Sequence, residues 1–274
     1  MKAGIIGGTG KMGKLFAPVF ERAGYSVMVS GRSTPVTSKD IALTCDLVVV
    51  SVPIRDTIRV IGEIAPLLRE DQLLCDFTSL KAGPVAAMLA SKAQVIGLHP
   101  MFGPTVSSIA RQTIVMCPAR VNGTTLSDLR RIFTSEGAVC TIATPEEHDR
   151  MMAIVQGLTH FVTICMADSI RRLGVDIEKT GPFMSPVYQI ELSLVGRLLS
   201  QDPALYGDIL QENPFVPPVL DACRAAAGEL AEIVASGDPE AFAAFFSRDT
   251  EHLGAYCGRG QVLTDALIEC MVKK

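Results

Sequence analysis

Short apolar runs rich in β-branched residues alternate with amphipathic stretches in the first half of the chain. The apolar runs predict strands at Ala3–Gly7, Ser26–Ser30, Leu47–Val52, Leu73–Phe77, Gln94–Leu98, Thr113–Cys117 and Ala138–Ala143. The stretches between them predict helices at Gly13–Ala23, Thr57–Leu68, Gly83–Ala90 and Thr125–Ser135. Near-continuous apolar strands are typical of a parallel sheet that helices cover on both faces. Residues 1–143 are therefore expected to form a doubly wound α/β domain.

The pattern changes after residue 143. Thr144-Pro145-Glu146-Glu147 has the residue types of a helix start, and the helical period then continues to Leu173. His148, beside two glutamates in the first turn, is expected on the surface. Further helices are predicted at Pro186–Ser200, Val219–Ser236 and Pro239–Tyr256, with no convincing strand among them. Residues 144–274 are thus expected to form an all-helical domain. Its apolar helices also predict burial against a second subunit, hence a homodimer.

Composition narrows the class of protein. The chain has 274 residues, 48% of them hydrophobic and 20% charged, with a net charge of −4 and scattered basic residues. Nucleic acid is therefore not an expected partner. The apolar runs are shorter than the roughly 20 residues of a membrane span, and no signal peptide precedes the first strand, so we expect a soluble, cytoplasmic protein. None of the eight cysteines forms a CxxC pair, which favours free thiols over disulfides or a metal site.

A glycine-rich turn follows the first predicted strand. Gly8-Thr9-Gly10-Lys11-Met12-Gly13 has the GxGxxG spacing, and a helix begins within it. Glycines at this spacing let the backbone approach a pyrophosphate, whose negative charge a helix N-terminus favours. The motif in this context predicts a Rossmann-type dinucleotide site, and packing of the helix on the strand is the alternative role of the glycines.

The ends of the next strands predict which dinucleotide binds. An acidic residue at the end of the second strand would hold the ribose 2′-hydroxyl of NAD. Here Arg32, Ser33 and Thr34 stand there instead, and an arginine with neighbouring hydroxyls suits a 2′-phosphate. NADP is therefore expected, with NAD still possible. Ser51, Val52 and Pro53 end the third strand and are expected beside the nicotinamide.

Candidate reactive residues follow two later strands. Gly97-Leu98-His99-Pro100-Met101-Phe102-Gly103-Pro104 places a histidine where a buried strand opens into a rigid loop. Ser79 and Lys81 follow the preceding strand, so a parallel sheet brings them to the same edge. Histidine changes its protonation state near neutral pH. This edge is therefore the expected reacting site.

Four segments together resemble the prephenate/arogenate dehydrogenases of tyrosine biosynthesis. They are the His99-Pro100 loop, Ser79-Leu80-Lys81, Leu158-Thr159-His160-Phe161 and the segment from Gly196 to Pro203. The resemblance implies oxidative decarboxylation of prephenate to 4-hydroxyphenylpyruvate with hydride transfer to the nicotinamide. It also implies that His99 polarises the substrate hydroxyl while Ser79 holds the geometry. Arg197 would then clamp a carboxylate, with His160, Gln201 and Lys81 as further substrate ligands.

Several alternatives stay open at this stage. Arg197 can instead pair with Glu191 or Asp202, Lys81 can be solvated, and His160 can be a core histidine. The substrate can be arogenate or a 4-amino-4-deoxy analogue, or the chain can be a non-catalytic dinucleotide sensor. A hydroxyacid dehydrogenase is disfavoured, because residues 157–169 contain no lysine. We expect neither a chorismate mutase segment nor a regulatory domain, and therefore no tyrosine feedback through a separate domain.

Overall fold

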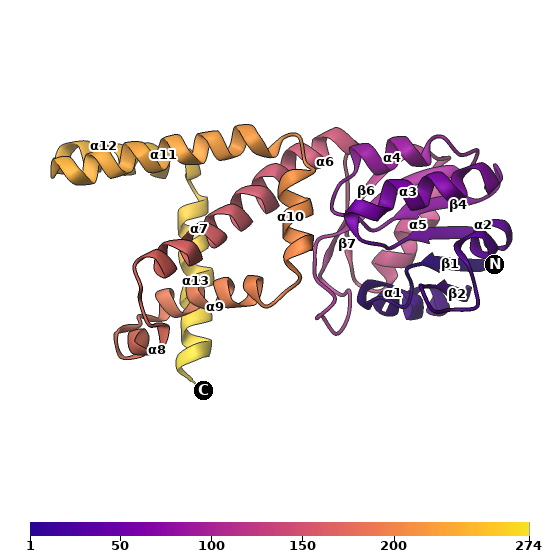
Figure 1. The fold of residues 1–274 in the computed structure, drawn as a ribbon, viewed down its shortest axis with the longest axis horizontal. Coiled ribbons are helices and arrows are strands. Elements are labelled where there is room, and N and C mark those ends of the chain that lie inside the picture. The colour runs from indigo at the N-terminus through magenta and orange to yellow at the C-terminus, as the bar shows by residue number, and fades with distance from the viewer. Residues whose placement is uncertain (274) are drawn as a thin grey trace. The chain divides into compact units, whose positions relative to one another are not determined.

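The computed structural model describes residues 1–273, which form two compact units (Figure 1). The first unit comprises Met1–Gln156 together with Ala204–Phe215. The second comprises Gly157–Pro203 and the chain from Val216 onward. The compact units therefore divide within the helical stretch that begins at Pro145, whose first turns pack on the first unit, and a later segment returns to that unit.

A seven-stranded sheet organises the first unit, in the order β2-β1-β3-β4-β5-β6-β7. Its strands are β1 (Lys2–Ile6), β2 (Ser26–Ser30), β3 (Leu47–Val50), β4 (Leu73–Asp76), β5 (Gln94–Pro100), β6 (Thr113–Arg120) and β7 (Val139–Ile142). All the predicted strands are confirmed. The sheet is not wholly parallel, however, because β6 runs antiparallel to β5 while every other pair is parallel. The chain leaves β1 toward opposite edges of the sheet for β2 and β3, so the carboxyl ends of these strands frame a topological switch point.

Helices cover both faces of this sheet, as the continuous apolar strands predict. On one face, α1 (Lys11–Arg22) and α5 (Gly123–Ser135) bury Phe16, Phe20 and Phe133 against the strands. On the other face, α2 (Ser38–Thr44), α3 (Ile54–Ile64) and α4 (Ala82–Met88) form a second apolar cluster. Figure 1 shows α3 and α4 side by side, with α1 on the opposite side of the strands. A short 3₁₀ turn, Ala65–Leu67, follows α3.

One helical stretch runs from the first unit into the second. It comprises α6 (Pro145–Met152), a π-helical turn (Ala153–Leu158) and α7 (Thr159–Arg172). The predicted start is confirmed, since Thr144 and Glu147 form a reciprocal capping box. Among the described residues this stretch alone is long and apolar enough, by length and composition, to cross a membrane. Its first turns, however, bury the polar side chains of His148 and Asp149 in the first unit.

The second unit is all helical, as expected. Besides α7 it contains α8 (Ile177–Thr180), a 3₁₀ turn (Gly181–Phe183), α9 (Pro186–Leu199), α11 (Val216–Ser236), α12 (Pro239–Leu253) and α13 (Tyr256–Val272). The predicted helix Pro239–Tyr256 ends early, because Gly254 turns the chain with a φ of 53°. Large apolar side chains such as Phe183, Phe246 and Val262 are exposed on this unit. Between α9 and α11, α10 (Pro203–Gln211) carries the chain back to the first unit.

Candidate functional site

The glycine turn after β1 is built on close backbone contacts. Gly7 has a φ of 80°, and a Cβ atom there would lie 2.1 Å from the carbonyl oxygen of Ser51. A Cβ on Gly13 would lie 2.4 Å from the Cα of Gly8, so α1 can approach the turn this closely only with glycine at position 13. A Cβ on Gly8 would lie 2.8 Å from the Ile5 carbonyl oxygen. Gly10 is the N-cap of α1 and offers no side chain to the helix start. The first turn of α1 also has no acidic residue, which leaves its N–H groups suited to a phosphate.

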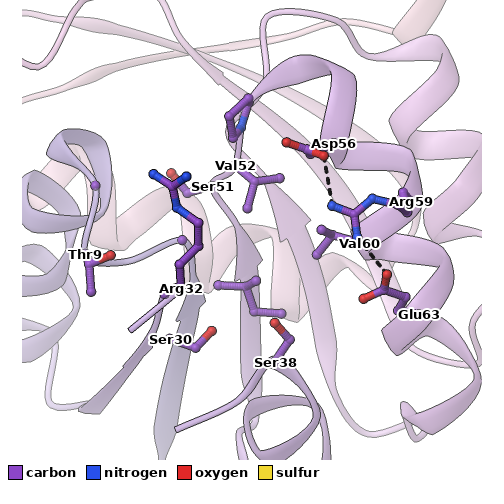
Figure 2. A pocket seen from close by; sticks show the side chains of 15 residues that line it. Thr9, Ser30, Arg32, Ser38, Ser51, Val52, Asp56, Arg59, Val60 and Glu63 are labelled. Carbon is purple, nitrogen blue, oxygen red and sulfur yellow. Dashed lines mark hydrogen bonds and ion pairs between the residues drawn. The ribbon is translucent and has the colours of Figure 1, made fainter. Parts of the chain in front are cut away.

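A cavity of about 500 Å³ opens above this turn, at the carboxyl ends of β1, β2 and β3 (Figure 2). Its lining includes Thr9, Gly10, Ser30, Arg32 and Ser51. The hydroxyl oxygen of Ser30 is buried and has no hydrogen-bond partner among the described residues. A buried polar atom without a partner costs free energy, so its position in the lining favours a polar ligand. The glycine cradle and this hydroxyl both fit a dinucleotide.

The predicted cofactor residues divide between the cavity and its support. Thr9, Gly10, Arg32, Ser51, Val52 and Pro53 line the cavity, whereas Gly8 and Gly13 pack the turn that forms its floor. Lys11 and Ser33 are exposed and do not belong to the lining, and Met12 packs against the apolar core. The Thr34 hydroxyl accepts from the Gly31 N–H at 2.8 Å and donates to the Val36 carbonyl at 2.8 Å, so it is used within its own turn.

A second arginine, which the sequence did not single out, lies on the opposite wall of the cavity. Arg59 on α3 bonds Asp56 and Glu63, each at 2.8 Å (Figure 2). The two carboxylates near the cavity are therefore already paired. Arg32 projects into the cavity from the end of β2, and no ion pair engages it in the described part of the chain. Arg32 is thus the cation best placed to meet an added anion.

His99 lies near the end of β5 and is almost wholly buried, with 3% of its surface exposed. Its Nδ1 lies 2.8 Å from Nε2 of His148, which α6 contributes. The Nδ1 of His148 lies 2.7 Å from a carboxylate oxygen of Asp149. The expectation that His148 lies on the surface is therefore wrong, because this face of α6 packs on α4 and β6. A row of three polar side chains runs from Asp149 through His148 to His99.

Asp149 is held from the opposite side by backbone groups. Its two oxygens accept the N–H groups of Lys81 and Ala82, each at 2.8 Å, at the start of α4. Its own backbone carbonyl accepts from the side-chain amide of Asn213 at 2.8 Å. Arg150 lies 4.3 Å over the ring of Phe215. Residues far apart in sequence thus fix the N-terminal turn of α6.

Lys81 does not have the role expected of it. Its side chain is fully buried, and its ammonium bonds the carboxylate of Asp76 and the Leu98 carbonyl, the latter at 2.8 Å. Gly97 makes room for it, because a Cβ there would lie 3.0 Å from the Lys81 Cδ. With its donors committed inside the protein, Lys81 cannot bind substrate from this position, and both the substrate-ligand and the solvated interpretations are wrong. It supports the strand end that carries His99.

Electrostatics keep the two histidines neutral. Burial, then His148 and then the nearby Lys81 ammonium lower the pKa of His99 well below its usual value. Burial also lowers the pKa of His148, although its bond to Asp149 opposes the shift. A neutral imidazole accepts a hydrogen bond at one nitrogen and donates at the other. At neutral pH His99 is therefore an uncharged acceptor and donor.

The other predicted site residues lie elsewhere. Ser79 is half-buried in the loop after β4, and no hydrogen bond joins it to His99 among the described residues. His160 is on α7 in the second unit, where burial lowers its pKa. Arg197 is in the last turn of α9, and the Gln201 amide donates to its backbone carbonyl at 3.1 Å. Gln201 thus lies two residues beyond the end of α9.

Sequence reasoning missed four polar residues that the structure places around His99 or the cavity. These are Asp76, His148, Asp149 and Ser30. Asp76 lies near the end of the predicted strand Leu73–Phe77, three residues before Ser79, which was a usable signal. His148 and Asp149 had none, because a polar first turn is typical of a solvated helix.

Comparisons with known proteins find family matches over most of the chain. Residues 31–142 match the model of the prephenate dehydrogenase nucleotide-binding domain, and residues 144–248 match that of the prephenate dehydrogenase dimerization domain. The chain is 36% identical to the probable arogenate/prephenate dehydrogenase of Methanocaldococcus jannaschii over 96% of its own length and 64% of the relative's. It is 34% identical to the T-protein of Enterobacter agglomerans over 96% of its own length and 70% of the relative's. The chain thus spans about two thirds of these relatives.

The fold is also that of a solved relative. Prephenate dehydrogenase from Aquifex aeolicus, solved in complex with hydroxyphenyl propionate and NAD⁺, superposes with a TM-score of 0.73 at 21% identity. That match covers 92% of this chain and 98% of the other. With both of its domain models matched in order and two relatives above 30% identity, the chain belongs to the prephenate dehydrogenase family.

Proposed function

We propose that this protein oxidatively decarboxylates prephenate to 4-hydroxyphenylpyruvate and CO2, with NADP as hydride acceptor. The observation that carries the proposal is the buried, neutral His99 in the same unit as the cavity above the glycine turn. A histidine must be uncharged to act as a general base, and burial favours this form of His99 at neutral pH. The relatives' names supply the substrate class. The biosynthetic relatives also favour a cytoplasmic site of action.

The chemistry places a defined demand on His99. As hydride leaves C4 of the substrate ring, the C4 hydroxyl becomes acidic, and Nε2 of His99 accepts its proton. The C1 carboxylate leaves as CO2, its bonding electrons make the ring aromatic, and the proton returns to the phenolate oxygen. No net proton is released. NADP, when bound, supplies the nicotinamide ring that takes the hydride.

Four further residues complete the proposed site. Ser79, in the loop beside the strand end of His99, holds the substrate hydroxyl in place. Arg197 clamps a substrate carboxylate, since a guanidinium can bind both of its oxygens. His160 and Gln201 are further substrate ligands, as the family resemblance implies. The exposed apolar side chains of the second unit, together with its match to a dimerization domain, support a homodimer.

The preference for NADP rests on Arg32. It projects into the cavity at the end of β2, where no acidic residue stands. Arg32→Ala should therefore weaken NADPH binding by about tenfold or more, because a charged hydrogen bond is worth about 1.5–3 kcal/mol. NADH binding should change little. Arg130→Ala, an exposed arginine on α5, is the matched control, and equal losses for both nucleotides would argue against a 2′-phosphate contact.

The deciding experiment follows nicotinamide reduction with prephenate, arogenate and the 4-amino-4-deoxy analogue, each with NAD and with NADP. We expect turnover to be fastest with prephenate and NADP. Faster turnover of arogenate or the analogue would reassign the substrate. Nucleotide binding without turnover of any pair would favour a sensor instead. His99→Asn should abolish turnover while leaving NADPH binding intact, and an active variant would remove His99 from the mechanism.

A further inference from the structure

The row of hydrogen bonds behind His99 determines which of its nitrogens carries the proton. Both oxygens of Asp149 accept hydrogen bonds from backbone N–H groups, which suits the ionised carboxylate. A carboxylate can only accept a hydrogen bond from His148. The Nδ1 of His148 must therefore carry a proton. A neutral His148 then has a lone pair on Nε2, which accepts from Nδ1 of His99. Nε2 of His99 is left unprotonated.

We propose that His148 is a positioning residue that holds His99 in its Nδ1–H tautomer and directs the Nε2 lone pair toward the substrate. The inference rests on the proposed function only for the identity of that substrate. In general, a group that is hydrogen-bonded to one nitrogen of a histidine fixes the tautomer of that ring. His148 does this for His99, and a third group does the same for His148. Here the third group is Asp149.

The surroundings of the row oppose its rearrangement. Reversing both tautomers would place the lone pair of His148 against the Asp149 carboxylate, which is repulsive. Asp149 cannot turn away without losing the N–H groups of Lys81 and Ala82. His148 has 2% of its surface exposed, so water does not offer a replacement partner. The tautomer is therefore set by the fold, before any substrate binds.

This arrangement suits a proton that must return. The hydroxyl proton on Nε2 makes His99 a cation, and the carboxylate of Asp149 stabilises it through His148. Because the row ends at backbone N–H groups rather than at solvent, it offers no exit for the proton, which goes back to the phenolate oxygen. The row thus assigns His148 to orientation and charge stabilisation, with no net proton transfer of its own.

A pair of variants separates positioning from simple packing. His148→Gln keeps an acceptor near the position of Nε2, whereas His148→Leu removes it. With His148→Leu, kcat should fall by about tenfold or more, because the base loses its fixed tautomer. KM and NADPH affinity should stay within about threefold. His148→Gln should restore a substantial part of kcat. His252→Gln, an exposed histidine on α12, is the control for an unrelated imidazole.

The direct readout is ¹⁵N NMR of the full-length protein with labelled histidine. The chain has four histidines, so His99 can be assigned by comparison with His99→Asn. We expect Nδ1 of His99 to be protonated and Nε2 to be unprotonated in the wild-type protein and in His148→Gln. Protonation on Nε2 in the wild-type protein would overturn the proposal, and so would a kcat of His148→Leu within about twofold of that of His148→Gln.

The NMR readout is independent of the reaction. If no substrate is turned over, the proposed function fails, but the tautomer of His99 measured by NMR still tests the positioning role of His148. If His148→Leu does not fold, the wild-type spectrum decides by itself.

Discussion

Replacing Lys81 tests the buried ion pair beneath His99. In Lys81→Met the aliphatic stem is kept while the ammonium is lost, so the fully buried Asp76 carboxylate loses its cation. Breaking a buried pair by removing one partner costs about 3–5 kcal/mol. The Asp76 carboxylate still accepts hydrogen bonds from the Thr78 hydroxyl, from the Thr78 N–H at 3.1 Å and from the Leu98 N–H at 3.3 Å. We therefore expect about 3 kcal/mol, the lower end of that range.

Urea unfolding followed by far-UV circular dichroism measures the loss, since the chain has no tryptophan to report by fluorescence. With a denaturant slope of about 1–3 kcal/mol per molar, the midpoint should fall by about 1 M or more. Lys14→Met, an exposed lysine on α1, should change stability by less than about 0.5 kcal/mol. Adding Asp76→Asn to Lys81→Met should recover more than about 1 kcal/mol, because the uncompensated charge is gone.

Two results would refute this reasoning. One is a loss below about 1 kcal/mol in Lys81→Met, which would mean that the pair is not buried as described. The other is unchanged stability with a raised KM, which would return Lys81 to the substrate site.

Three further predictions follow from the same structure. Gly13→Ala should weaken NADPH binding and cost about 1–3 kcal/mol of stability, because the added Cβ meets Gly8. Gly62→Ala, which has open space around its Cβ, should be neutral or stabilising. Calorimetry with and without NADPH measures both effects. The pKa values of His99, His148 and His160 are lowered by folding, so the unfolded chain binds more protons below its own histidine pKa of about 6.5. The urea midpoint should hold above that pH and fall as the pH drops from about 6.5 toward 5.5; a midpoint that rises there would contradict the shifts. Arg197→Leu should mainly raise KM for prephenate, and an unchanged KM would make the arginine structural.

The strands and the cofactor turn were predictable because their signals are local. An apolar run specifies a buried strand, and GxGxxG specifies a backbone that must come close to its neighbours. The direction of β6 was not predictable, because an apolar run can pair with β5 in either the parallel or the antiparallel orientation. The capping box of α2, Thr37 with Asp40, was a local signal that the prediction overlooked.

The polar residues around His99 could not be predicted in the same way. His148 stands next to Glu146 and Glu147, and sequence neighbours like these usually face water. Only the packing of α6 on α4 and β6 turns His148 inward while Glu147 caps the helix. Lys81 likewise reads as a solvated loop residue until Gly97 is seen to leave space for its stem. Such pairings are decided by contacts between distant segments.

The return of α10 to the first unit constrains how the protein can be made and cut. The chain passes between the units three times, after Gln156, Pro203 and Phe215. A fragment that stops at Gln156 lacks Asn213, which bonds the Asp149 carbonyl, and Asp208, which pairs with Arg55 at 3.1 Å. On the ribosome, the nucleotide-binding unit is therefore completed only after the first helices of its partner unit have been synthesised. Neither unit can be separated from the other by a single cleavage.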